Sequence, residues 1–404
     1  MSGQTWTPHS EEEAVGMIAS AASEHRQLRL VGSGTKSASF ADETDKLSSL
    51  GLSGIVAYNP AELVITAKAG TPMTEIQATL DEHRQMLSFE PGSWGTALGV
   101  PGTQTIGGIA AANQSGSRRF LAGAARDSLL GVRFVNGQGE IIKNGGRVMK
   151  NVTGLDLVKL LGGSWGSLGF LTEVSFKVLP CPVTEKTLAI ELTSDVDATP
   201  LLAAAMATSA DISGAAHLPS RSINLLASDL GIERPTAMLR FEGFEASVDE
   251  RIERVKKHLP TISKSTILEA DVSKKLWANL NDLALFSGAI NPPLWKLSLP
   301  PTEGIKTALA LSANADANWF ADWQGGLVWI ECAAPSEYVR QLAKQAGGHA
   351  TLMRLGADTD PASGMFQPQS AAATKLSEAV RHSLDPKEVF RSPMTFASNQ
   401  PLVA

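Results

Sequence analysis

The stretch that decides the fold of this sequence is TIGGIAAANQSG, at positions 105–116. Its paired glycines and small side chains let the main chain approach a flat ligand closely, while Thr105, Asn113 and Ser115 add short hydrogen-bonding groups. Taken alone, the three alanines at 110–112 equally fit a close contact between two helices. Two further glycine clusters, one on each side along the chain, decide between these interpretations.

The first of these clusters, GSGTKS at 32–37, follows the segment LRLV at 28–31, which predicts a short buried strand. It does not match a Rossmann fingerprint, because serine takes the place of the third glycine and no amphipathic helix follows. Nor does it match a Walker A loop, because Thr35 separates Gly34 from Lys36. Without side-chain cover, its backbone N–H groups form a nest of the kind that binds phosphate, although such a loop by itself is more often an ordinary turn.

The other cluster, GGSWGSLGFLTE at 162–173, leads into a predicted strand at 170–178 in which apolar and polar residues alternate. By itself, this cluster is consistent with a plain β-turn. Three glycine loops that each adjoin a strand are nevertheless more than connections between elements. The sequence therefore predicts a ligand site built largely from main chain.

Ordinary local signals predict several elements between these clusters. Ser10 is expected to cap one helix, and Thr71 followed by Pro72 is expected to start another. The dipeptide NG at 136–137, between the segments 129–135 and 140–143, predicts a β-hairpin. Thr153 is expected to cap a short helix.

The combination of motifs resembles the FAD-binding domain of the vanillyl-alcohol-oxidase or p-cresol methylhydroxylase (PCMH) type. Four patterns of that family occur here in the same order: the glycine loop at 32–37, TIGGxxAxNxxG at 105–116, an RD pair with the hairpin at 126–139, and GxxGxLGxxTE at 163–173. The resemblance implies an α+β fold, with a PCMH-type FAD-binding domain of two α+β subdomains over residues 1–180.

The same resemblance implies which residues bind FAD. The first loop would hold the pyrophosphate, the second the central part of the cofactor, and the third the adenosine end. The residues that match the family's motifs are Gly32, Ser33, Gly34, Thr35, Lys36, Ser37, Thr105, Gly107, Gly108, Ala111, Asn113, Ser115, Gly116, Gly169, Phe170 and Thr172. Thr35 stands where covalent relatives carry a histidine, so the resemblance implies that FAD is bound non-covalently.

A second domain is predicted over 181–404, after a PCP boundary. Four strand-then-helix units there predict an α+β cap domain, with helices on one side of an antiparallel sheet. Its segments PPLWKLSLPP at 292–301, GHATLMR at 348–354 and FQP at 366–368 resemble the FAD-binding subunit of bacterial glycolate oxidase. The closing DPKEVF at 385–390 matches that family's tail and is expected to return toward the flavin, with RSP following where relatives carry NPG.

This second resemblance implies a subunit of a complex that oxidises glycolate to glyoxylate. Its expected partners are a larger FAD-containing subunit and an iron–sulfur subunit that receives the electrons. Two alternatives stay open: a self-sufficient FAD-dependent dehydrogenase for another small 2-hydroxy acid such as D-lactate, and a non-catalytic assembly subunit that has lost FAD. The expected location is cytoplasmic, with any attachment to the inner membrane made through the partner subunits.

The sequence names no catalytic base. The GDGNxH-like stretch of related 2-hydroxyacid dehydrogenases is absent, and the seven histidines are scattered, with His349 expected to be structural. Arg118 and Arg119 are expected at a solvated loop end, with contact to a carboxylate or to the pyrophosphate as the alternative. The five aromatic residues between 295 and 329 are expected to form sheet core rather than a docking face.

Composition excludes several classes of protein. With 35 Lys and Arg against 41 Asp and Glu, the net charge of −6 argues against nucleic-acid binding. Cys181 and Cys332 lie far apart without CxxC motifs, so we expect no disulfide framework, no metal site and no cysteine-ligated cluster in this chain. No apolar run approaches the ~18 residues that a membrane span needs, and the first 16 residues lack the pattern of a signal peptide.

Overall fold

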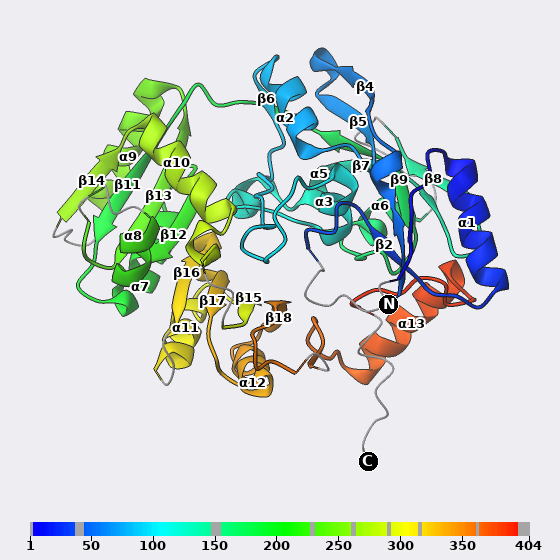
Figure 1. Ribbon diagram of the computed structural model, residues 1–404. Coiled ribbons are helices and arrows are strands. Elements are labelled where there is room, and N and C mark those ends of the chain that lie inside the picture. Colours follow the sequence, from blue (N-terminus) through cyan, green and yellow to red (C-terminus); the bar gives the residue numbers. More distant parts are fainter. Residues whose placement is uncertain are drawn as a thin grey trace.

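The computed structural model describes residues 3–36, 44–146, 155–226, 230, 232–259, 264–288, 292–313, 317–360 and 363–394. It has two lobes (Figure 1). The first contains the elements up to β10 (Leu179–Pro180), and the second contains those from β11 (Thr184–Glu191) to β18 (His349–Arg354). Helix α13 (Ala371–Leu384) then returns to the first lobe.

The smaller sheet of the first lobe is parallel, with the order β1-β3-β2. Its strands are β1 (Thr5–Trp6), β2 (Leu28–Val31) and β3 (Asp45–Ser48). Helix α1 (Glu11–Ser23) packs against it through a shared apolar core. The helix begins as predicted, because the Ser10 hydroxyl accepts a hydrogen bond from the Glu13 N–H at 3.1 Å.

The larger sheet of the first lobe is antiparallel, with the order β4-β5-β9-β7-β8. Its strands are β4 (Ile55–Asn59), β5 (Val64–Lys68), β7 (Leu129–Val135), β8 (Ile141–Gly145) and β9 (Phe170–Lys177). The hairpin prediction is confirmed, because β7 and β8 pair directly. The helices that share its core are α2 (Met73–Asp81), α3 (Ile106–Ala112), α5 (Ala125–Ser128) and α6 (Leu157–Leu161). These two sheets with their helices are the two α+β subdomains of the prediction.

The start of α2 differs from the prediction. The helix begins at Met73, and Pro72 occupies its N-cap position without a side-chain hydrogen bond. The hydroxyl of Thr71, the expected cap, donates instead to the Lys68 carbonyl oxygen at 2.7 Å. That hydrogen bond fixes the end of β5, so this threonine is not free to cap the helix. Thr153, the other expected cap, lies outside the described residues.

The second lobe is built on one antiparallel sheet of eight strands, in the order β14-β11-β13-β12-β16-β17-β15-β18. Besides β11 and β18, its strands are β12 (Gly214–Leu218), β13 (Thr236–Gly243), β14 (Lys264–Leu268), β15 (Leu294–Ser298), β16 (Asn318–Asp322) and β17 (Leu327–Glu331). The predicted antiparallel α+β fold is therefore confirmed. The sequence signals found only four of the strands, those of the strand-then-helix units.

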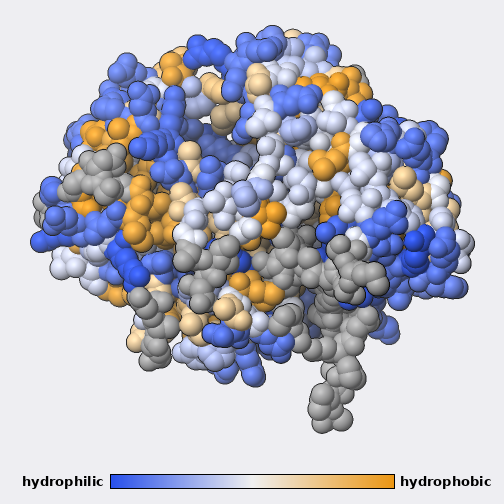
Figure 2. All heavy atoms as spheres, viewed as in Figure 1, coloured by the Kyte–Doolittle hydropathy of each residue, from blue (hydrophilic) through white to orange (hydrophobic). Residues whose placement is uncertain are grey.

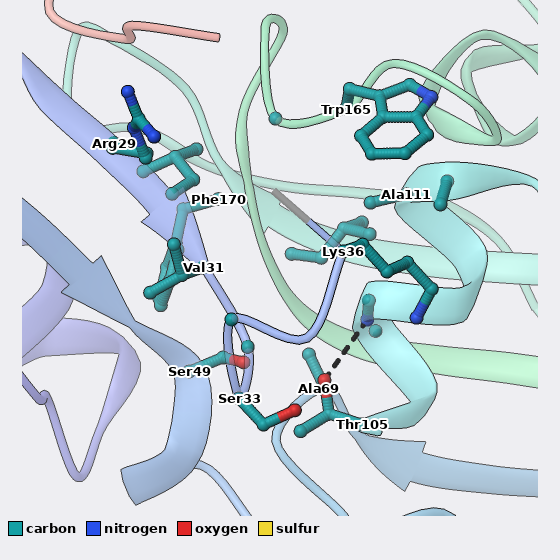
Figure 3. A pocket seen from close by; sticks show the side chains of 18 of the residues that line it. Arg29, Val31, Ser33, Lys36, Ser49, Ala69, Thr105, Ala111, Trp165 and Phe170 are labelled. Atoms are coloured by element: carbon teal, nitrogen blue, oxygen red, sulfur yellow. Dashed lines mark hydrogen bonds between the residues drawn. The ribbon is translucent and has the colours of Figure 1, made fainter. Parts of the chain in front are cut away.

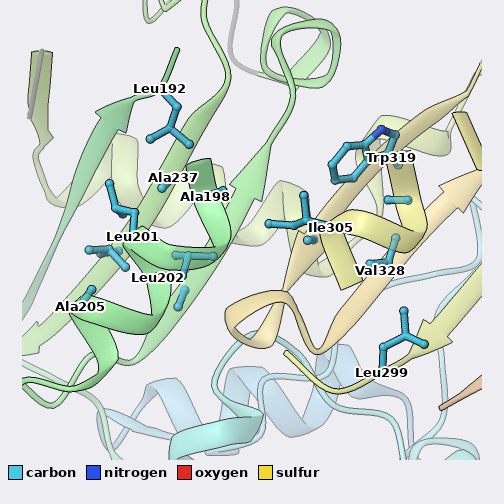
Figure 4. Packing of buried hydrophobic residues seen from close by; sticks show 14 of the residues in the cluster. Leu192, Ala198, Leu201, Leu202, Ala205, Ala237, Leu299, Ile305, Trp319 and Val328 are labelled. Atoms are coloured by element: carbon cyan, nitrogen blue, oxygen red, sulfur yellow. The ribbon is translucent and has the colours of Figure 1, made fainter. Parts of the chain in front are cut away.

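Helices cover both faces of this sheet rather than one. The helices on the first face are α7 (Ala198–Met206), α9 (Glu245–His258), α11 (Gly304–Ser312) and α12 (Ser336–Gln345), and Figure 4 shows part of their core. The helices on the second face are α8 (Ser220–Leu226) and α10 (Ala270–Asn281), joined there by the loop around Trp94 from the first lobe. The expectation of one covered face was wrong because β11 and β13 bury residues on both of their sides.

Short elements complete the described chain. These are α4 (Arg119–Ala122), β6 (Gln85–Met86), which pairs with β10, and 3-10 turns at Ser49–Gly51, Pro60–Glu62, Asp195–Asp197, Ala284–Phe286 and Trp323–Gly325. On the face shown in Figure 2, hydrophilic side chains predominate over both lobes, with apolar ones in small groups between them.

The segment after α13 lies against the first lobe. Asp385 folds it into a turn, because its carboxylate accepts hydrogen bonds from the N–H groups of Val389 at 2.9 Å and Phe390 at 2.7 Å. Phe390 then forms a parallel bridge with Leu28 on β2. The chain beyond this bridge therefore runs along the end of the strand that precedes the first glycine loop.

Candidate functional site

A pocket in the first lobe lies between the end of β2, helix α3 and the loop that precedes β9 (Figure 3). All three predicted glycine clusters contribute to its wall. The lining residues are Arg29, Leu30, Val31, Gly32, Ser33, Gly34, Thr35, Lys36, Ser49, Ala69, Thr105, Gly107, Gly108, Ala111, Ala112, Trp165, Gly166, Gly169, Phe170, Leu171 and Pro393.

The structure brings most of the predicted cofactor residues together in this pocket. They are Gly32, Ser33, Gly34, Thr35, Lys36, Thr105, Gly107, Gly108, Ala111, Gly169 and Phe170. These residues come from positions far apart in the sequence, so their meeting in one cavity follows from the fold. Their contact with FAD stays a prediction.

Four predicted residues do not line the pocket. Asn113 accepts a hydrogen bond from the Arg126 N–H at 2.9 Å, and Ser115 accepts one from the Ala125 N–H at 3.0 Å. Gly116 packs against α10, and Thr172 donates its hydroxyl hydrogen to the Glu11 carboxylate at 2.5 Å. These four residues therefore make contacts within the protein in this structure. Ser37 lies outside the described residues.

The first glycine loop presents unpartnered main chain to the pocket. Within the described part of the chain, the N–H groups of Ser33, Gly34, Thr35 and Lys36 have no hydrogen-bond acceptor. Gly34 has a φ of +77°, a left-handed conformation that turns successive N–H groups toward one concave side. Partly buried N–H groups without acceptors fit an anionic group such as a diphosphate.

Helix α3, by contrast, has little main chain to offer an anion. The N–H of Ile106 donates to the Thr71 carbonyl oxygen at 3.0 Å, and that of Gly107 donates to the Ala69 carbonyl oxygen at 2.9 Å. The Gly108 N–H reaches the Thr105 hydroxyl at 3.2 Å, which is the dashed line of Figure 3. Any phosphate in this pocket therefore depends on the loop at 32–36.

Packing alone requires glycine at several positions of the pocket, Gly32 and Gly107 among them. A Cβ on Gly32 would overlap the Thr105 hydroxyl, and one on Gly107 would lie 2.6 Å from the Ala69 Cβ. Gly108 differs, because its nearest obstacle is the Thr105 hydroxyl at 3.1 Å. Its missing side chain leaves pocket space open, which is the space that a flat ligand needs.

Lys36 is the cation of the pocket wall that faces α3. Its side chain lies across the cavity toward the turn that contains Gly108 (Figure 3). The residue keeps some exposed area, but desolvation of its ammonium group lowers the pKa to about 7. The charge of Lys36 is therefore under-compensated, and a phosphate in the pocket would supply the missing counter-charge.

Sequence reasoning missed several lining residues, among them Trp165 and Pro393. Trp165 was inside the third glycine cluster but had no assigned role. Pro393 belongs to the RSP that departs from the family's tail, and Ser392 beside it donates to the Trp165 carbonyl oxygen at 2.9 Å. The turn at Asp385 directs this segment to the pocket. No local sequence pattern predicts that the tail reaches it.

The expectation of a solvated loop end was wrong for Arg118. Its guanidinium is buried and pairs with Glu242 on β13 of the second lobe. Arg119 lies partly buried, 4.5 Å above the ring of Trp323. The aromatic residues between 295 and 329 are buried in the sheet cores, as expected.

The described residues offer neither a candidate metal centre nor a candidate membrane-spanning helix. In these ranges no three His, Cys, Asp or Glu side chains are placed to hold a metal ion. No helix within them has the length and apolar composition needed to cross a membrane.

Comparison with known proteins agrees with the pocket's chemistry. The model of an FAD-binding domain family matches residues 4–145, which include two of the three glycine clusters. Glycolate oxidase subunit GlcE of Escherichia coli (strain K12) is 32% identical over 344 residues, covering 85% of each chain. The chain belongs to the GlcE family.

Membership of the GlcE family makes the chain one of the FAD-linked oxidoreductases related to glycolate oxidase and D-lactate dehydrogenase. The mitochondrial D-lactate dehydrogenase [cytochrome] of Arabidopsis thaliana is 26% identical over 229 residues, 55% of this chain and 39% of that protein. The structure of 4-ethylphenol oxidase from Gulosibacter chungangensis superposes with a TM-score of 0.73 at 13% identity, over 95% of this chain and 87% of that one. That likeness shows the fold alone.

Proposed function

We propose that this chain binds FAD non-covalently as a subunit of a complex that oxidises glycolate to glyoxylate and passes electrons to an iron–sulfur partner. The observation that carries the proposal is the unpartnered N–H nest at 33–36 in a pocket assembled from the three glycine clusters. Membership of the GlcE family supports the choice of glycolate and of a multi-subunit complex.

Different residues of the pocket would contact different parts of FAD. The loop at 32–36 would receive the diphosphate on its N–H groups, and Lys36 would add a positive charge beside it. The open space at Gly108 and Ala111 would take a flat part of the cofactor against α3. Thr35, in the position where covalent relatives have histidine, offers no ring nitrogen for a covalent link.

Bound FAD supplies a two-electron acceptor for the hydrogen on the carbon that bears the substrate hydroxyl. The protein must orient that carbon and exclude competing reactions, and these tasks fall to residues between the lobes. A larger FAD-containing subunit is the proposed first partner, and the iron–sulfur subunit is the proposed electron outlet. This chain need not turn over glycolate alone.

The test is purification of the tagged full-length chain, by itself and from cells that contain its natural partners. We expect a yellow protein whose flavin is released into the supernatant when the chain is precipitated with acid, and co-purification of a second flavoprotein together with an iron–sulfur protein. A colourless chain that takes up no added FAD would overturn the cofactor assignment. A flavin that stays with the precipitate would overturn the non-covalent assignment.

A second candidate is a self-sufficient dehydrogenase for D-lactate or another 2-hydroxy acid. The similarity to D-lactate dehydrogenase over 55% of the chain favours it. One measurement distinguishes the two candidates, the flavin absorbance of the isolated chain after substrate is added. Only the self-sufficient enzyme would reduce, and so bleach, its own flavin. Purified chain that reduces dyes with glycolate unaided would contradict the subunit proposal.

A further inference from the structure

Lys296 lies among three tryptophans where the two lobes meet. Its ammonium nitrogen is 5.4 Å from the ring centroid of Trp94, 5.6 Å from that of Trp323 and 5.8 Å from that of Trp329. Trp329 is its direct neighbour on β17, whereas Trp94 arrives from the first lobe. The indole faces are attractive to a cation, but they carry no net charge with which to neutralise it.

A second cation shares one of these rings. The guanidinium carbon of Arg119, on α4 of the first lobe, lies 4.5 Å from the Trp323 ring centroid. The backbone holds that ring in place through a left-handed turn at Trp323 (φ +51°), and its indole N–H donates to the Gly116 carbonyl oxygen at 2.9 Å. Lys296 and Arg119 thus approach one rigidly mounted indole from different lobes.

Neither cation has an acidic partner in the part of the chain that the structure describes. No carboxylate there lies within salt-bridge distance of Lys296 or Arg119. Asp127 is close enough for its charge to raise the pKa of Arg119, against the lowering by burial. Its carboxylate already accepts a hydrogen bond from the Ala124 N–H at 2.8 Å. Partial burial of Lys296 and Arg119 without acidic partners costs free energy. A bound anion would lower that cost.

The pKa shifts of Lys296 and His349 also indicate a lack of negative charge in this cluster. Burial, and then the charge of Arg119, lower the pKa of Lys296 to about 8. His349 at the start of β18 is exposed as a residue, but partial desolvation of its imidazole and the charges of Lys296 and Arg119 lower its pKa. The region is therefore short of negative charge at neutral pH, while Lys296 keeps part of its surface open to solvent.

This cationic cluster borders the walls of the proposed FAD site. Trp94 precedes Gly95, whose Cβ position would lie 3.5 Å from the side chain of Thr35 in the pocket. Trp323 is hydrogen-bonded to Gly116, the last residue of the second glycine cluster. An anion held by Lys296 and Arg119 would therefore lie near the loop at Trp94 and Gly95, which packs against Thr35 of the pocket, whereas Gly116 itself does not line the pocket.

We propose that Lys296 and Arg119, mounted on the Trp323 ring, bind the carboxylate of a small hydroxy acid. The inference rests on the proposed function and says where its substrate is anchored. A guanidinium offers a carboxylate two parallel hydrogen bonds, and the ammonium adds a point charge from the other lobe. Because one cation comes from each lobe, the site exists only when the lobes are docked as they are here.

The test uses the full-length chain as it purifies, with flavin content measured on the same sample. The probe is oxalate, a small carboxylate that offers no carbon-bound hydrogen for oxidation, and binding is followed by titration calorimetry. We expect wild-type protein to bind oxalate saturably and to ignore glycolamide, which keeps the shape of glycolate without its charge. Lys296→Met and Arg119→Met should each weaken oxalate binding about tenfold or more.

Lys306→Met is the matched control. Lys306 lies on α11, over the opposite face of the sheet, and its ammonium pairs with Glu303 at 3.2 Å. Its loss should leave oxalate affinity unchanged while altering the net charge equally. Lys296→Arg, which keeps the cation, should bind oxalate within a few-fold of wild type, and this variant carries the test if the methionine variant does not fold.

The proposal is overturned if wild-type chain does not bind oxalate, or if Lys296→Met and Arg119→Met bind it as tightly as wild type. Its failure is distinguishable from failure of the proposed function. A yellow chain that co-purifies with its partners but ignores oxalate refutes only the carboxylate site. A colourless chain that binds oxalate through Lys296 refutes only the cofactor assignment.

Discussion

Arg240 on β13 holds Glu90 of the first lobe in a two-point ion pair, with Nη1–Oε1 at 3.2 Å and Nη2–Oε2 at 2.7 Å. Two positions along the same strand, Glu242 pairs with Arg118, so the charges are reversed between the two contacts. Residues i and i+2 of a strand face the same side, which places both pairs on one interface. This reciprocal arrangement fixes how the lobes dock, and therefore where Lys296 meets the first lobe.

Arg240→Met should destabilise the fold by about 3–5 kcal/mol, because it removes a buried guanidinium and leaves the partly buried Glu90 carboxylate without its partner. The measurement is the free energy of unfolding in urea. Arg254→Met is the matched control, because Arg254 belongs to an exposed helical pair with Glu250 and its loss should cost less than about 1 kcal/mol. Equal effects of the two substitutions would contradict the interface role. The double variant Glu90→Gln with Arg240→Met should recover part of the lost stability.

Gly108→Val should abolish FAD binding while leaving the chain folded. A Cβ there would lie 3.1 Å from the Thr105 hydroxyl and 4.0 Å from the Lys36 ammonium nitrogen, so the branched side chain extends into the pocket rather than into the core. Flavin content per chain is the measurement, with circular dichroism to verify the fold. Gly16→Val on α1, where nothing lies within 4 Å of the added Cβ, is the control and should keep its flavin. A Gly108→Val protein that purifies with full flavin would show that the site assignment is wrong.

The sequence predicts this pocket well, because the information is local. Each glycine cluster is recognisable from its own residues, and the fold then brings them together: Gly32 follows β2 of the parallel sheet, Gly108 lies in α3, and Gly169 precedes β9 of the antiparallel sheet. Asn113 and Ser115 share the motif but turn their side chains toward neighbouring backbone N–H groups. A motif records which residues are needed, and not whether a ligand or the fold needs them.

The cationic cluster is invisible in the sequence for the opposite reason. Trp94, Arg119, Lys296, Trp323 and Trp329 come from two lobes, and only the docking of those lobes brings them together. The same long-range docking buries Arg118, which its neighbours in the sequence suggested was solvated. A side chain's burial depends on what arrives from elsewhere in the chain, and periodicity carries no record of that.

Phe390→Ala should cost about 3–5 kcal/mol of stability, because the ring is buried between α1 and β2 at the point where the tail rejoins the first lobe. It should also weaken FAD binding, since Pro393, which lines the pocket, follows Phe390 by three residues along the same tail. Leu376→Ala on the exposed side of α13 is the control and should change neither quantity. Unfolding in urea and FAD titration measure the two effects, and a tail variant that binds FAD normally would exclude the tail from the site.

The affinity for FAD should fall as pH rises above about 7, and Lys36 should be the cause. Burial lowers the pKa of its ammonium group to about 7, whereas a bound diphosphate favours the protonated form and raises that pKa. Below pH 7 the group is charged with or without ligand, so affinity is constant; above it, binding must take up a proton. The dissociation constant should then rise by up to about tenfold per pH unit, until the pKa of the bound form is reached.

FAD titration of the cofactor-free chain from about pH 6 to about pH 9 measures this dependence, and Lys36→Met should bind more weakly with a flat profile. The stability of the protein without FAD should change with pH in the opposite direction to its FAD affinity. Because the folded pKa lies below the ordinary value of 10.5, the unfolded chain binds more protons between pH 7 and 10.5, and stability should increase with pH across that window. A wild-type affinity that stays constant from neutral to alkaline pH would mean that the Lys36 ammonium does not face the diphosphate.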